Sequence, residues 1–120
     1  MPPMAHGTAQ LCLPPLVEAT LLAFVAGVRE RLGARVLAIR LFGSYARGEA
    51  TEESDVDCLV LLDLADRDAD RAITDLAADL TWQIGGVVVS PMVMSAAEFA
   101  AWKALERRTP LEIEREGIPL

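Results

Sequence analysis

The chain has 120 residues, of which 52% are hydrophobic, and this size and composition predict one domain around one core. Its formal net charge of -7 argues against non-specific nucleic-acid binding, because such binding depends on cations that displace phosphate counterions. The sequence has no run of eighteen apolar residues and no secretory signal. We therefore expect a cytoplasmic protein that does not enter a membrane, with a small molecule or another protein as its substrate.

Cysteine and histidine are scarce and scattered. Cys12 and Cys58 lie far apart with no C-x-x-C partner, and Cys58 falls in an apolar run, which is typical of a buried structural thiol. The single histidine, His6, belongs to a Pro/Met/Gly-rich head, residues 1–14, that we expect to be disordered. These residues indicate neither a zinc site nor a redox site, and residues 15–120 are predicted to form the single domain.

The first predicted element is an amphipathic helix that begins at Pro14 or Pro15 and ends at Gly33. Its apolar residues recur at spacings of three and four: Val17, Leu21, Phe24, Val25, Val28 and Leu32. Two short apolar segments follow, Val36–Gly43 and Val56–Asp63, and both are typical of buried strands.

A second amphipathic helix is predicted over residues 66–84, with its acidic residues on a solvated face. Residues 85–95, "GGVVVSPMVMS", predict a third strand, in which Pro91 indicates an edge position or a bulge. Ser95 and Glu98 have the spacing of a capping box, which predicts the start of another helix.

The last predicted helix has Thr109 as its N-cap, Pro110 at its first position, Glu112 as a capping glutamate and Gly117 as its stop. The predicted order is α-β-β-α-β-α-α. This order is typical of an α/β (α+β) domain with a small mixed sheet of at least three strands flanked by helices.

The segment "LFGSYARGEATEESDVDCLVLLD" concentrates the polar residues that packing does not require. A strand that ends at Gly43 and leads into Ser44 presents backbone N–H groups beside a hydroxyl, and glycine lets a polyanion approach the main chain. Arg47 adds a fixed positive charge. The pattern predicts a phosphate-binding turn.

Two aspartates follow at the start of the next strand. Asp55 and Asp57 are at i and i+2, so their side chains point to one face, with Cα atoms about 6 to 7 Å apart. Paired carboxylates at this spacing can share a hard cation, and Mg²⁺ is the natural one. A phosphate-binding turn beside such a pair is suited to phosphoryl or nucleotidyl transfer.

The motif "GSYARGEATEESDVD", which has the form G-S-x10-D-x-D, resembles the minimal nucleotidyltransferases of the DNA polymerase beta-like superfamily. The resemblance extends over most of residues 15 to 118, including the third strand and the "PLEIEREG" tail. It implies a nucleotidyltransferase fold.

The resemblance also implies a role for each matching residue. Gly43 and Ser44 would hold the β- and γ-phosphates of ATP, and Arg47 would steady either the loop or the triphosphate. Asp55 and Asp57 would be the catalytic pair that binds Mg²⁺, as one ion or two.

One feature departs from the superfamily pattern. Its members usually supply a third carboxylate from a later strand, yet no acid occurs here between Asp79 and Glu98, and Ser90 is the candidate for that position. Without that acid, three possibilities are open. The acceptor hydroxyl is already activated, a partner protein supplies the activation, or the domain binds nucleotide without efficient turnover.

The resemblance thus implies a Mg²⁺-dependent enzyme that transfers AMP from ATP to a hydroxyl. Small members of this group resemble antitoxins whose partner is a HEPN-domain ribonuclease toxin, modified on a tyrosine. Two alternatives remain open at this point: a non-catalytic nucleotide-binding or toxin-neutralising module, and an antibiotic-type adenylyltransferase, although the latter normally carries an added substrate-binding domain.

Overall fold

The computed structural model describes residues 13–105 and 108–120. The first helix of this part, α2 (Pro15–Leu32), has proline at its first position and ends at Gly33, whose φ of 51° is unfavourable for other residues. The predicted helix is therefore confirmed. A short 3-10 helix, η1 (Gly33–Arg35), connects it to the sheet. The expected disordered head, with His6 and Cys12, falls almost entirely outside the described residues.

The sheet contains β1 (Val36–Phe42), β2 (Val56–Leu62), β3 (Val89–Ser95) and β4 (Ile118–Pro119), in the spatial order β3-β2-β1-β4. Strand β1 is antiparallel to both β2 and β4, whereas β2 is parallel to β3. The predicted mixed sheet is confirmed, and Pro91 lies on an edge strand as expected. The two-residue strand β4 has no counterpart in the prediction.

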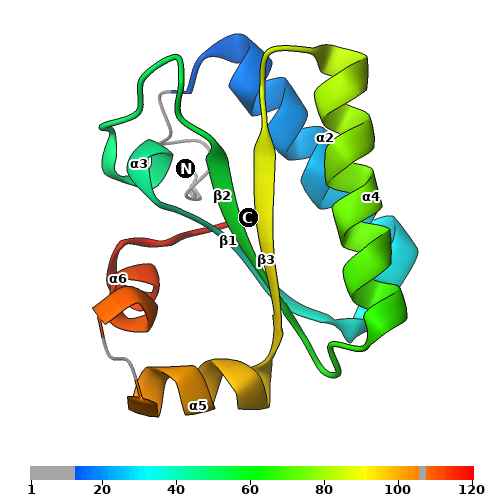
Figure 1. The fold of residues 1–120 in the computed structure, drawn as a ribbon, viewed down its shortest axis with the longest axis vertical. Helices are drawn as coiled ribbons and strands as arrows, with labels where there is room; N and C mark the ends of the chain where they lie inside the picture. Colours follow the sequence, from blue (N-terminus) through cyan, green and yellow to red (C-terminus); the bar gives the residue numbers. More distant parts are fainter. Residues whose placement is uncertain (1–12, 106–107) are drawn as a thin grey trace, which may run out of the picture.

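One face of the sheet is covered by α2 and by α4 (Arg67–Ile84), which lie side by side in Figure 1. The N-cap of α4 is Asp66, whose carboxylate accepts a hydrogen bond of 2.8 Å from the Ala69 N–H. Most of the acids of α4 are exposed, as predicted. The sheet residues of this core include Ile39, Leu41, Val56, Cys58, Val60, Leu62, Val89 and Val93.

The other side of the sheet carries α5 (Ala96–Leu105) and α6 (Arg108–Glu116) (Figure 1). The predicted capping box is confirmed, because Glu98 accepts from the Ser95 N–H at 2.8 Å and Ser95 Oγ accepts from the Glu98 N–H at 3.0 Å. Thr109 as the N-cap of the last helix is wrong, since α6 already includes Arg108.

The physical reason for that error is that proline is tolerated throughout the first helical turn, where no intrahelical N–H bond is required. Pro110 therefore does not mark the first residue of α6. Gly117 follows the helix as expected, and its N–H donates to the Ile113 carbonyl at 2.8 Å.

In the part of the chain that the structure describes, no helix is both long and apolar enough to cross a membrane.

Candidate active site

The predicted phosphate-binding turn lies between β1 and a single helical turn, α3 (Ser44–Arg47). Gly43 precedes it with φ 77° and ψ -157°, a conformation that residues other than glycine rarely adopt. The first hydrogen bond within this turn runs from the Arg47 N–H to the Gly43 carbonyl at 3.2 Å. The amides of the first three residues of α3 precede that bond, so they can donate to an anion.

Gly43 is required for a second reason, which is its contact with β2. A Cβ atom built on Gly43 would collide with the Asp57 carboxylate, and it would lie 3.2 Å from Asp57 Cγ. The main chain of the turn and the carboxylate are therefore in direct contact. Gly43 directly follows β1 and Asp57 lies on β2, and they meet because Phe42 pairs with Asp57 across the β1–β2 ladder.

The structure also brings Asp55 and Arg47 close to Asp57. Asp55 is exposed in the loop before β2, and Asp57 is half-buried on the strand. Burial raises the pKa of Asp57, the charge of Asp55 raises it further, and the charge of Arg47 lowers it. Asp57, with its raised pKa and a second carboxylate close by, is a site where a bound Mg²⁺ would relieve the repulsion.

Arg47 forms an exposed ion pair with Glu49, with 3.0 Å between Nε and Oε1. The hydrogen bond to Glu49 is the main cause that raises the pKa of Arg47, and Glu116 and Glu112 of α6 add to it. Arg47 and Gly43 share a crevice of about 20 Å³ with those two glutamates. Arg47 is thus paired with one exposed carboxylate, and a guanidinium can bind either a carboxylate or a phosphate.

Strand β3 supplies no third acid. The register pairs Ser90 with Asp57 on the neighbouring parallel strand, so both side chains lie on the same face of the sheet. Within residues 13–105 and 108–120, no three Asp, Glu, His or Cys side chains are grouped as metal ligands. Two carboxylates still fit Mg²⁺, because this ion is usually bound by one or two carboxylates together with substrate phosphates and waters.

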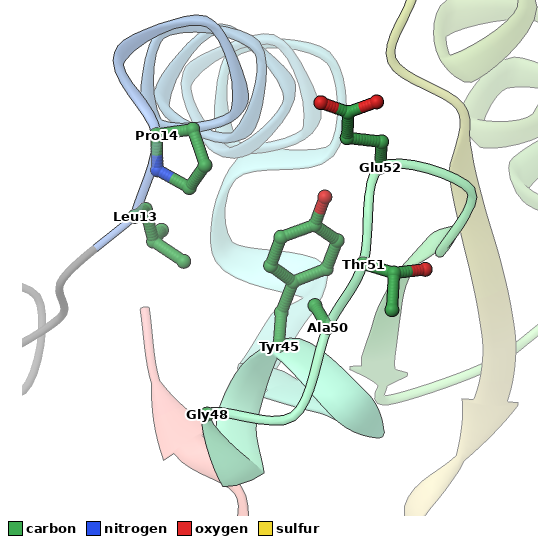
Figure 2. Close-up of a pocket in the computed structure, with 7 residues that line it drawn as sticks. All are labelled: Leu13, Pro14, Tyr45, Gly48, Ala50, Thr51 and Glu52. Carbon is green, nitrogen blue, oxygen red and sulfur yellow. The ribbon is translucent and has the colours of Figure 1, made fainter.

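A cavity of about 370 Å³ flanks α3 on another side, between the start of α2 and the loop after Gly48. Figure 2 shows the Tyr45 ring pointing from α3 into the space between Pro14 and Glu52. Gly43, Ser44 and the two aspartates do not line this cavity. We therefore locate the candidate site by the contacts around Asp57 and not by the size of the cavity.

Cys58 follows Asp57 but faces the opposite side of the sheet, where it is fully buried in the core. Burial raises the pKa of its thiol to about 12, so the thiol stays protonated and unreactive at neutral pH. The predicted structural role of Cys58 is confirmed.

Sequence reasoning did not find the acids of α6 that lie near Arg47. Glu112 was interpreted as a helix-capping residue, and Glu116 carried no signal. Their position depends on how α6 packs against the end of β1, more than sixty residues away in the chain, and no local pattern encodes that packing.

With this geometry established, the comparisons with known proteins define the class. Residues 23–110 match the model of the nucleotidyltransferase domain family. The match covers more than half of the chain, so the protein belongs to that family and is a nucleotidyltransferase that acts on a nucleotide substrate.

Among individual relatives, a protein of Methanocaldococcus jannaschii that is named as a protein adenylyltransferase is 40% identical over 82 residues, which cover 68% of this chain and 77% of the relative. The protein adenylyltransferase MntA of Thermococcus cleftensis is 52% identical over 44 residues, covering 37% of this chain and 42% of that protein.

A solved structure described as a toxin-antitoxin with AMP-PNP has a TM-score of 0.50 at 20% identity, covering 80% of this chain and 68% of that chain. This likeness shows a shared fold.

Proposed function

We propose that this protein transfers AMP from ATP to a hydroxyl of a partner protein, with Mg²⁺ as the cofactor, and that the partner is a HEPN-domain toxin. The observation that carries the proposal is the contact of the Gly43 turn with Asp57, beside Asp55 and Arg47. The relatives that are named protein adenylyltransferases support a protein acceptor, and the neighbour solved with AMP-PNP supports an adenine nucleotide. We assign the activity to residues 15–120 and to the cytoplasm, where ATP is abundant.

In this mechanism the triphosphate binds at the start of α3. Gly43 leaves room for the Asp57 carboxylate beside the turn, and the Ser44 hydroxyl and the first amides of α3 donate hydrogen bonds to the β- and γ-phosphate oxygens. Arg47 leaves Glu49 and pairs with the triphosphate. These contacts orient the α-phosphate toward the carboxylate pair.

Asp55 and Asp57 would hold Mg²⁺, which supplies neutralisation of the triphosphate charge and polarisation of the phosphoryl oxygens. The acceptor oxygen forms a bond to the α-phosphorus while the bond from that phosphorus to the pyrophosphate oxygen breaks. The acceptor hydroxyl gives its proton to solvent water, and pyrophosphate leaves with the electron pair of the broken bond.

Within the described part of the chain, this site lacks a good proton acceptor beside Asp57. Ser90 occupies the β3 position beside Asp57, and a hydroxyl is a far poorer base than a carboxylate. We therefore expect slow transfer to simple alcohols. A protein that holds its tyrosine in line with the leaving pyrophosphate would be a better acceptor, because alignment lowers the barrier without a base.

Intact mass spectrometry tests the proposed activity. The protein is incubated with ATP, Mg²⁺ and the protein encoded by the neighbouring gene, and the partner is expected to gain the mass of one or more AMP groups. The isolated protein with ATP and Mg²⁺ should release little pyrophosphate. A partner that forms a stable complex but stays unmodified would favour the non-catalytic module, and modification of an aminoglycoside-type alcohol in its place would favour the antibiotic-type enzyme.

Ser44→Ala tests the phosphate-binding turn. Among the described residues the Ser44 hydroxyl has no hydrogen-bond partner, so its removal should leave the melting temperature nearly unchanged. ATP affinity in the presence of Mg²⁺ should fall by about 1.5 to 3 kcal/mol, the contribution of one hydrogen bond to a charged group. Calorimetric titration measures the loss, and Thr74→Ala, which removes an exposed hydroxyl from α4, is the control. Equal ATP affinity in Ser44→Ala and wild type would place the triphosphate elsewhere.

A further inference from the structure

The face of the sheet that carries Asp57 has an ordered set of side chains. Phe42 pairs with Asp57 across β1 and β2, and Asp57 pairs with Ser90 across β2 and β3. The same face continues along β3 with Met92 and Met94, which pair with Leu59 and Leu61 of β2. The catalytic carboxylate therefore lies at one end of an apolar strip.

This face is covered less completely than the opposite one. Leu59 is buried beneath Phe99 of α5 and Ile113 of α6, whereas Phe42, Met92 and Met94 are only half-buried. A cavity of about 140 Å³ lies over the β1 and β2 part of this face, lined by Arg40, Leu59, Leu61, Phe99, Ile113 and Glu114, and it does not extend to Met92 or Met94. We call Phe42, Ser90, Met92 and Met94 the open face.

The open face lies on the side from which the acceptor of the reaction must approach. An acceptor hydroxyl must reach the α-phosphate beside Asp57, and α2 and α4 close the other face of the sheet. On this face Ser90 is exposed and Met92 and Met94 keep part of their surface in solvent beside α5 and α6, so an acceptor that reaches Asp57 along β3 would contact them. Methionine side chains are flexible and polarisable, so Met92 and Met94 can adapt to the side chains of a partner.

Charge and strand geometry define the chemistry of that partner. Asp55, Glu112 and Glu116 are exposed around the site, and only some of this negative charge is offset by Arg47. A cationic segment is therefore attracted to the site. Pro91 removes a backbone donor from the edge strand β3, which favours side-chain docking over addition of another strand.

We propose that the open face is the docking surface for the acceptor protein, which contributes a segment with apolar and cationic side chains around its reactive hydroxyl. This inference rests on the proposed function, since it names the surface that selects the acceptor of that reaction. It assigns to Met92 and Met94 a role in acceptor specificity, separate from ATP binding.

Met92→Glu tests the docking surface, with the protein encoded by the neighbouring gene as the probe. Transfer of AMP is measured over a range of partner concentrations, and KM for the partner should rise at least about tenfold while ATP affinity stays unchanged. Met92→Ala combined with Met94→Ala is a second variant that adds no charge and should also raise KM. Leu22→Glu, at a 51% exposed position on α2, is the control and should behave like wild type.

The two hypotheses fail in different ways. If wild type modifies the partner and the Met92 variants do so with unchanged KM, the docking surface is refuted while the proposed function stands. If wild type transfers no AMP, the proposed function is refuted, and calorimetry of the complex then tests the surface. Loss of partner affinity in Met92→Glu but not in Leu22→Glu would support the open face, and equal affinity in both would refute it.

Discussion

Replacing Gly43 by alanine should weaken ATP binding at least about tenfold and lower the stability of the fold. The φ of 77° with ψ of -157° imposes backbone strain of about 1 to 3 kcal/mol on any other residue. The new Cβ also collides with the Asp57 carboxylate, which must then move away from its position beside the turn. We expect at least a tenfold loss of ATP affinity with Mg²⁺, of the order of one lost charged hydrogen bond, together with a lower melting temperature.

Gly33→Ala is the control that separates the effect of backbone strain from the effect of the contact between Gly43 and Asp57. Gly33 also has a positive φ, 51°, but a Cβ there has no neighbour within 4 Å and the residue ends α2, away from the site. This variant should lose stability and bind ATP like wild type. Unchanged ATP affinity in Gly43→Ala would contradict the proposal that the phosphates lie close to the main chain at Gly43.

The double variant Asp55→Asn/Asp57→Asn should lose AMP transfer and the Mg²⁺ dependence of ATP binding. The metal contributes several kcal/mol of charge stabilisation in such reactions, which corresponds to at least about a hundredfold in rate. Stability should not fall. The raised pKa of Asp57 means that the fold disfavours its ionised form, so the contribution of Asp57 to stability decreases as pH rises through its titration, and neutralisation removes that cost.

Asp75→Asn/Asp79→Asn is the matched control, because it removes two exposed charges from α4. It should bind ATP and transfer AMP like wild type. The measurements are calorimetric titrations of ATP with and without Mg²⁺, thermal melts, and the mass of the partner. Identical Mg²⁺ dependence in wild type and in the Asp55/Asp57 variant would contradict the metal site.

The elements that were predicted correctly carry strong local signals. The helix from Pro15 has apolar residues at helical spacing and a glycine at its end, and the capping box at Ser95 is formed by two residues of one turn. The short strands around the G-S-x10-D-x-D motif are apolar and bounded by turn residues. In each case the interactions that define the element lie within a few residues, so the pattern along the chain is sufficient.

Strand β4 and the start of α6 were not predicted, for related reasons. Ile118–Pro119 becomes a strand only because β1 has a free edge beside it, and two residues have no periodicity to recognise. The helix α6 already includes Arg108, because proline is tolerated at any position of the first helical turn and the Thr109-Pro110 pattern therefore does not fix the first residue.

The amino-acid sequence by itself determined which groups are available for chemistry: a glycine and a serine after an apolar strand, an arginine, and two aspartates at alternate positions of the next strand. These relations depend on covalent spacing and on the alternation of side chains along a strand, so they are legible without a fold. Only the tertiary structure decided that Gly43 contacts Asp57, that Ser90 stands beside it, and that the α6 acids lie near Arg47. Those positions follow from strand register and helix packing between distant segments, which depend on the whole core and not on any one stretch of residues.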